Sequence, residues 1–143
     1  MAVAKKKPPG RRRDESNLRD EILRLWGARP DLMLWRNNVG VGRGLSNAQS
    51  IIKFGLVGSA DIMGVWRRTH TIKTVTNPNS FTPYEREFTA THGHALAIET
   101  KTKKGRLTVE QCRFQVAWEA AGGVYILARE LEDVSDVLGG PHK

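Results

Sequence analysis

Apolar residues near the start of the chain recur at helical spacing. Leu18, Ile22 and Leu25 fall on one stripe of an amphipathic helix. Asp14 is a suitable N-cap for that helix, and Gly27 is a typical residue to end it. The pattern therefore predicts a helix of about three to four turns that begins at Asp14 and stops at Gly27.

Short extended runs and a second amphipathic segment follow this helix. We expect strands at residues 32–35, 58–66, 94–101 and 124–128, and helices at 108–121 and 131–138. A strand, a helix and a strand in succession form a right-handed parallel crossover. The order of the elements predicts an α/β fold in which helices flank a mixed central sheet.

Two segments interrupt this series. Residues 67–93 alternate weakly, are rich in threonine and contain the turn sequence Asn-Pro-Asn-Ser, which predicts a protruding hairpin or a long loop. Gly40, Gly42 and Gly44 indicate a flexible loop, and residues 46–54 are expected to form one or two helical turns. These glycines lack the Gly-Lys-Ser/Thr ending of a phosphate loop and do not match the dinucleotide fingerprint.

The length and composition fit one compact domain. The chain has 143 residues, 39% of them hydrophobic, and no apolar run approaches the roughly 18 to 20 residues of a membrane span. Residues 1–13 contain six cations and no apolar periodicity, so we expect a disordered basic arm before a single domain at 14–143. Cys112 is the only cysteine, which excludes an internal disulfide framework and favours a reducing compartment such as the cytoplasm.

The chain is also strongly basic. It has 23 Lys and Arg residues against 15 Asp and Glu residues, a net charge of +8. Such an excess suggests a polyanionic partner, and nucleic acid is the commonest one for a small basic intracellular domain. Charge alone assigns no chemistry, and the spacing of His70, His92 and His94 fits no standard zinc site.

Charged residues occur where a buried strand would carry apolar ones. Glu99 and Lys101 are two apart in a predicted strand, so they share one face while Thr100 points away. If the strand that follows Asp61 lies beside the strand that carries Glu99 and Lys101, two carboxylates and a lysine converge at the end of a sheet. This set suits a hard divalent metal ion and phosphodiester hydrolysis. The alternative is a solvent-exposed Glu99–Lys101 pair, with Asp61 as a turn residue.

Two further polar residues, Glu15 and Gln111, each have two possible roles. Glu15 begins the apolar stripe of the first helix, where it is either a favourable charge at the helix N-terminus or a site residue. Thr108 and Gln111 have the spacing of a capping box, in which the Gln side chain returns to the Thr backbone amide. The alternative role of Gln111 is that of an active-site residue.

Two polar segments are candidates for DNA contacts. Arg36, Asn37, Asn38 and Arg43 can hold phosphates near the site, or they form an ordinary polar turn and loop. The second group follows the Glu99 strand and can contact phosphate or form a solvated basic turn; it consists of Lys103, Lys104 and Arg106.

In this order, the elements resemble the PD-(D/E)XK nuclease superfamily and, more narrowly, a stand-alone VRR-NUC (virus-type replication-repair nuclease) domain. The resemblance covers roughly residues 14–129. The positions that match the family are the helix glutamate Glu15, the metal and catalytic residues Asp61, Glu99 and Lys101, and the glutamine motif Gln111 with Phe114. Ala60 stands where the superfamily has a proline, which is not a metal ligand.

The resemblance implies a restriction-endonuclease-like core and a set of roles. Asp61 and Glu99 would bind Mg²⁺ or Mn²⁺ with the main-chain carbonyl of Thr100, and Lys101 would position the attacking water. Glu15 would bind through water or reach a second metal ion. The implied activity is that of a homodimeric endonuclease on branched DNA, including four-way (Holliday) junctions, in a bacterial or phage setting. The alternatives are a non-catalytic DNA-binding module and a flap or RNA nuclease.

Overall fold

The structure is a computed structural model that describes residues 10–43, 51–76, 79 and 84–142. Its elements, in chain order, are α1 (Gly10–Trp26), β1 (Leu32–Arg36), β2 (Gly40–Arg43), β3 (Ile51–Phe54), β4 (Ile62–Thr76), β5 (Tyr84–Thr100), α2 (Val109–Ala120), β6 (Val124–Ala128) and α3 (Leu131–Leu138). No helix in these ranges is long and apolar enough to cross a membrane.

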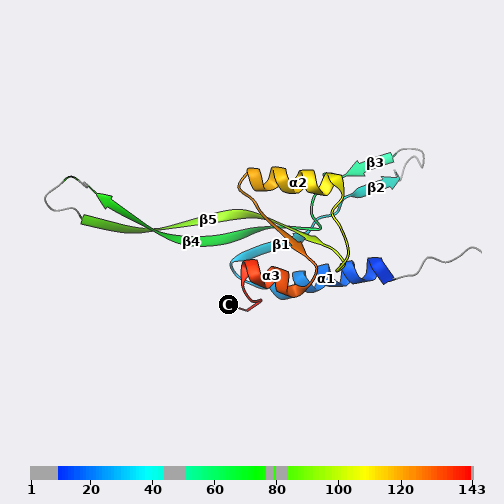
Figure 1. Ribbon diagram of the computed structural model, residues 1–143, viewed down its shortest axis with the longest axis horizontal. Helices are drawn as coiled ribbons and strands as arrows, with labels where there is room; N and C mark the ends of the chain where they lie inside the picture. The colour runs from blue at the N-terminus through cyan, green and yellow to red at the C-terminus, as the bar shows by residue number, and fades with distance from the viewer. Residues whose placement is uncertain (1–9, 44–50, 77–78, 80–83, 143) are drawn as a thin grey trace, which may run out of the picture.

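The central sheet has four strands in the order β1-β4-β5-β6. β1 and β5 each pair antiparallel with β4, whereas β6 runs parallel to β5 after the crossover through α2. The prediction of an α/β fold with a mixed sheet flanked by helices is confirmed. Figure 1 shows α1 and α3 on one side of the sheet and α2 on the other.

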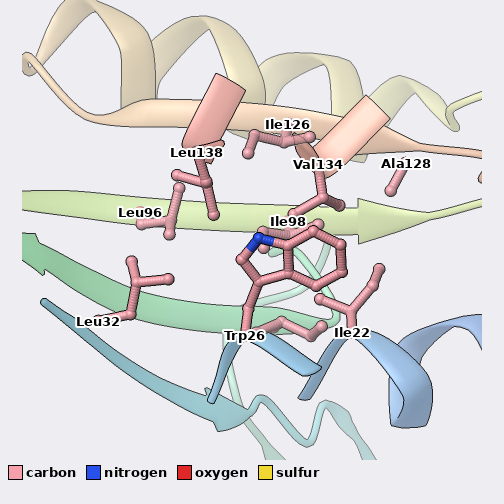
Figure 2. Close-up of a cluster of buried hydrophobic side chains, with 10 residues drawn as sticks. Ile22, Trp26, Leu32, Leu96, Ile98, Ile126, Ala128, Val134 and Leu138 are labelled. Carbon is pink, nitrogen blue, oxygen red and sulfur yellow. The ribbon is translucent and has the colours of Figure 1, made fainter. Parts of the chain in front are cut away.

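The apolar core lies between the sheet and the α1–α3 side. Ile22 and Trp26 of α1 and Val134 and Leu138 of α3 pack against Leu96, Ile98, Ile126 and other buried residues (Figure 2). Because alternate residues of a strand face opposite sides, Leu96 and Ile98 point into this core while Glu99 does not. Full burial of one such side chain contributes about 1.5 to 3 kcal/mol, so this face anchors the sheet.

Beyond the sheet, β4 and β5 continue as a two-stranded ribbon. β1 pairs with β4 only as far as Trp66, and β6 pairs with β5 only from Leu96 onward, yet the β4–β5 register runs out to Thr76 opposite Tyr84. The ribbon extends away from the helices (Figure 1). The protruding hairpin expected at 67–93 is therefore present and built from strands, and its turn sequence falls mostly outside the described residues.

Three local expectations are wrong: the start of α1, the helical turns at 46–54 and the flexible loop at Gly40 and Gly42. α1 begins at Gly10 rather than Asp14, because the arginines of residues 11–13 are good helix formers and extend it. Ile51–Phe54 is a strand rather than a helical turn, since the β-branched Ile51 and Ile52 favour pairing with β2. Gly40 and Gly42 lie in β2, while residues 44–50 lie outside the described ranges.

Candidate active site

Asp61 stands immediately before β4, and the end of β5 holds its carboxylate. The Thr100 backbone amide donates a hydrogen bond to Asp61 Oδ2 over 3.0 Å, and the Thr100 hydroxyl donates to the same atom over 2.5 Å. The Asp61 carbonyl accepts a hydrogen bond from the Asn37 amide at 2.8 Å. The expectation that the Thr100 side chain points away from the site is thus wrong: Thr100 ends β5, where the side chain can reach past the sheet edge.

Glu99 is the most buried charged residue of the site. Its side chain is 1% exposed, and its Oε1 lies 2.7 Å from the Lys101 ammonium, which is itself 14% exposed. Gln111 Nε2 donates a hydrogen bond to the same Oε1. The other carboxylate oxygen, Oε2, is buried and has no hydrogen-bond partner among the described residues. A buried, unpaired carboxylate oxygen is costly unless something else coordinates it.

The ionised form of Glu99 is destabilised more by burial and by Asp61 than it is stabilised by Lys101. Burial raises the pKa of Glu99 to about 7, the Lys101 hydrogen bond opposes this shift, and the charge of Asp61 adds to it. Burial also raises the pKa of the Tyr125 hydroxyl, with Glu99 and Asp61 contributing, so Tyr125 stays protonated. Its hydroxyl oxygen is likewise buried, and no residue in the described ranges forms a hydrogen bond with it. A cation beside Asp61 and Glu99 would relieve this imbalance.

The donor set fits a hard divalent cation. Asp61 and Glu99 supply carboxylate oxygens, and Glu99 Oε2 has no competing partner. Mg²⁺ is typically bound by one or two carboxylates and keeps several water molecules. Within the described ranges, no group of three or more His, Cys, Asp or Glu side chains comes close enough to hold a metal.

Glu15 contacts the chain just after β5 and forms no hydrogen bond with Asp61 or Glu99 among the described contacts. Its Oε1 accepts a hydrogen bond from the Thr102 amide at 3.2 Å, which fixes the chain just after β5. Through this contact Glu15 holds the turn that follows Lys101.

Gln111 closes the predicted capping box and also contacts Glu99. The Gln111 backbone N–H donates to Thr108 Oγ1 at 3.2 Å, and the Thr108 backbone N–H donates to Gln111 Oε1 at 2.9 Å. These two hydrogen bonds complete the capping box of α2. The free end of the same side chain, Nε2, reaches Glu99. The cap therefore orients Gln111 toward the carboxylate.

The loop before Asp61 packs against the first turn of α2. Gly58 has a φ of +83°, and a Cβ built on it would lie 2.6 Å from the backbone of Glu110. Only glycine fits this conformation and this approach. Gly58 thus lets the chain pass close to α2 and enter the site at Asp61.

The predicted DNA-contact residues divide into several groups. Arg36 and Asn38 line a pocket beside Asp61, whereas Asn37 is structural, because its Nδ2 donates to Ser59 Oγ and to the Ala60 carbonyl, both at 2.8 Å. The side chain of Arg43 lies outside the described part. Lys104 and Arg106 are exposed in the turn after β5; Lys103 is also exposed there, 3.6 Å from Glu130.

Sequence reasoning missed Arg19, Tyr125 and the hydroxyl of Thr100. Arg19 is a helix residue that lines the Asp61 pocket, and its position after Glu15 at a spacing of one helical turn was the available signal. Tyr125 lies in the predicted strand 124–128, where an aromatic residue is ordinary.

Comparison with known proteins gives no match: no family model matches the chain, and neither does any curated protein or solved structure.

Proposed function

We propose that this protein is a metal-dependent endonuclease that hydrolyses phosphodiester bonds in DNA. The observation that carries the proposal is the grouping of Asp61, Glu99 and Lys101, in which a buried Glu99 oxygen lacks a hydrogen-bond partner in the described part of the chain. The net charge of +8 supports a nucleic-acid substrate. The mixed α/β sheet is compatible with a PD-(D/E)XK core of the VRR-NUC type, which we propose as the family.

In this proposal the acidic residues hold Mg²⁺ or Mn²⁺. Asp61 and Glu99 supply side-chain oxygens, the main-chain carbonyl of Thr100 is a further ligand, and Glu15 binds through water or a second ion. When bound, the ion neutralises charge on the phosphate and lowers the pKa of water. Thr100 orients Asp61 through two hydrogen bonds, and Gln111 orients Glu99. These contacts reduce the reorganisation that the carboxylates need during the reaction.

Lys101 acts on the water and on the phosphate. Its ammonium is 2.7 Å from Glu99 Oε1, which keeps the long side chain directed into the site. From there it donates hydrogen bonds to the attacking water and to oxygens on which negative charge develops. The proposed contacts for the DNA backbone are Arg36, Asn38, Arg43, Lys103, Lys104 and Arg106.

We also propose that the enzyme acts as a homodimer on branched DNA, such as four-way junctions, in a bacterial or phage-infected cytoplasm. The outward face of α2 supports an interface between two copies, because Val109 and Val116 are 62% and 67% exposed and Leu56 and Val57 lie exposed near the same helix. An exposed apolar surface of this kind marks an interaction site. Cys112 is exposed in this helix and can report the contact.

The dimer is tested by light scattering of the wild type and of Val116→Asp. The wild type is expected at twice the monomer mass and the variant at the monomer mass, since a charge at a buried interface position is strongly unfavourable. A wild-type protein that is monomeric across the concentration range would remove this part of the proposal.

The activity is tested with end-labelled linear duplex, flap, four-way-junction and RNA substrates in Mg²⁺, Mn²⁺ or EDTA. We expect cleavage of the junction with either ion and none in EDTA. Asp61→Asn and Lys101→Met should each reduce the rate by roughly 10²-fold or more, because each removes a group that acts on the reacting phosphate or its metal ion. Glu132→Gln removes one charge from an exposed position on α3 and should cleave like the wild type.

The other outcomes identify the alternatives. Binding of the junction without cleavage under any condition would indicate a non-catalytic DNA-binding module. Preferential cleavage of the flap or of RNA would retain the mechanism and replace the substrate. Cleavage that persists in EDTA would contradict the two-carboxylate metal site.

A further inference from the structure

A pocket of about 450 Å³ opens next to Asp61. Its walls come from three parts of the chain: α1, the end of β1 with the residues that follow it, and the loop before β4. The charged residues among its lining are Arg19, Arg36 and Asp61. A pocket of this size admits one small ligand group, such as a single nucleoside phosphate, and not the cross-section of a duplex.

Arg19 has a largely buried side chain, yet only one of its three side-chain nitrogens donates to a described residue. Its side chain is only 13% exposed, and its Nε donates to the neighbouring Asp20, which is itself 62% exposed. Among the described residues, its terminal Nη atoms have no hydrogen-bond acceptor. A largely buried arginine side chain whose terminal donors the protein does not use is suited to bind a carboxylate or a phosphate.

Arg29 is a buried arginine whose contacts are all within the protein, and it serves as a comparison for Arg19. Its side chain is 1% exposed, Nε and Nη2 donate to the Asp31 carboxylate, and Nη1 donates to the carbonyls of Leu138 and Gly140. All three nitrogens are used. The guanidinium of Arg19, by contrast, leaves its Nη atoms free beside a pocket, as expected for a residue that binds a ligand.

The second wall of the pocket supplies another cation. Arg36 ends β1, is exposed and has no ion-pair partner within the described residues. Asn38 also lines the pocket, whereas the amide nitrogen of Asn37 is already used by Ser59 and Ala60. Two arginines from separate elements thus face one space, in the arrangement that suits a phosphate.

We propose that this pocket binds one phosphate group of the nucleic-acid strand, adjacent to the phosphate that is hydrolysed, and that Arg19 and Arg36 are its ligands. The inference rests on the proposed nuclease function and adds a strand-positioning site to it. Because the Asp61 carboxylate forms part of the wall, a phosphate binds best when a divalent cation offsets that negative charge. Binding of phosphate and of metal are therefore coupled.

The test compares Arg19→Ala with Arg24→Ala in the full chain. Arg24 lies on the same helix, its side chain is 68% exposed, and its removal changes the net charge equally. For cleavage of junction DNA in Mg²⁺, we expect Arg19→Ala to raise KM about tenfold or more with a smaller change in kcat, the typical effect of losing a charge-assisted hydrogen bond. Arg24→Ala should change KM less than about threefold, as expected for an exposed charge. Arg19→Lys should recover part of the loss, which a folding defect would not explain.

A second measurement does not depend on cleavage. Inorganic phosphate is titrated into the wild type and into Arg19→Ala, with and without Mn²⁺, and binding is followed by calorimetry. We expect binding by the wild type that is strengthened by Mn²⁺ and weakened at least about tenfold in the variant. If the wild type cleaves DNA while Arg19→Ala matches Arg24→Ala in KM and in phosphate affinity, the pocket inference is wrong and the nuclease proposal stands. If no substrate is cleaved but phosphate binds through Arg19, the nuclease proposal fails and the pocket stands.

Discussion

The two faces of the central sheet are held by different forces. On the α1–α3 side, Leu96 and Ile98 of β5 are fully buried in a continuous apolar cluster with Trp26. On the α2 side, the same strand presents Glu99, and α2 itself contains no buried residue. One strand thus supplies both a core face and a polar face, because its side chains alternate.

The polar face depends on a few directed contacts in place of apolar packing. The capping box starts α2 at Thr108, and Gln111 reaches Glu99 from it. Trp118 stacks on Phe114 with ring centroids 5.3 Å apart and donates its indole N–H to the Val124 carbonyl over 3.1 Å. Substitutions on the core face should therefore cost mainly stability, and those on the α2 face mainly activity.

The largest loss of stability is expected for Arg29→Ala. Arg29 joins Asp31 to the carbonyls after α3, so its removal leaves the buried carbonyls without their donor and takes the cation from the Asp31 carboxylate. The expected decrease in the free energy of unfolding is about 3 to 5 kcal/mol. Urea denaturation measures it, with Arg24→Ala as the matched control.

The same ion pair has a pH signature. The Arg29 guanidinium lowers the pKa of Asp31 to about 2 from its ordinary 3.8. A depressed folded-state pKa stabilises the protein above the ordinary value, and this contribution is lost as the pH falls from 3.8 toward 2. Arg29→Ala should lack that part of the acid dependence, and equal acid dependence in both proteins would exclude a stabilising pair.

Leu96→Ala tests the apolar face directly. Leu96 is fully buried and is not part of the polar site, so the variant should lose about 2 to 5 kcal/mol of stability while its cleavage rate per folded molecule stays near that of the wild type. Val65→Ala removes a side chain that is 40% exposed and should cost much less. A Leu96→Ala enzyme that is stable but inactive would show that the two faces are not separable.

Glu99→Gln should make the metal-free protein more stable than the wild type at pH 7 and above, whereas Leu96→Ala makes it less stable. The pKa of Glu99 is raised from 4.5 to about 7, so the folded state binds the proton more tightly than the unfolded chain. Wild-type stability should therefore decrease as the pH rises from 4.5 to about 7, and this decrease should be absent in Glu99→Gln. Melting temperatures of both proteins in EDTA across this range check the prediction. Parallel profiles would mean that Glu99 is not desolvated.

Gln111→Glu should have the smallest effect on stability. Glu serves the capping box as well as Gln does, but it replaces the donor that faces Glu99 with a second carboxylate oxygen. The melting temperature should stay close to that of the wild type at pH 5 and fall at pH 8, where both carboxyl groups ionise, while cleavage falls by roughly 10²-fold. Wild-type cleavage by this variant would restrict Gln111 to its capping role.

The sequence predicted the elements that follow strong local rules. The capping box at Thr108, the strand at 124–128 and the helix at 131–138 were all expected from local residues, and the parallel crossover followed from their order. One error is the start of α1, where the good helix formers at 11–13 extend the helix beyond the Asp14 cap. The other is the short β2–β3 pair, whose formation depends on pairing between two strands and not on either strand alone.

For the site, spacing alone placed Glu99 and Lys101 on one face, because strand alternation is a local rule. The contact between Thr100 and Asp61 spans residues far apart in the sequence and depends on where two strands end, which alternation does not specify. Arg19 was missed for a similar reason, since a helix residue is recognised as a pocket residue only when the opposite wall is known.

The most direct test of the central claim, that the polar face holds a divalent cation, is calorimetric titration of Mn²⁺ into the wild type, Asp61→Asn and Glu132→Gln. We predict binding by the wild type and by Glu132→Gln, tighter at pH 8 than at pH 6 because Glu99 must lose its proton, and little or no binding by Asp61→Asn. Wild-type affinity for Mn²⁺ in a folded Asp61→Asn protein, or no binding by the wild type at pH 8, would contradict the account.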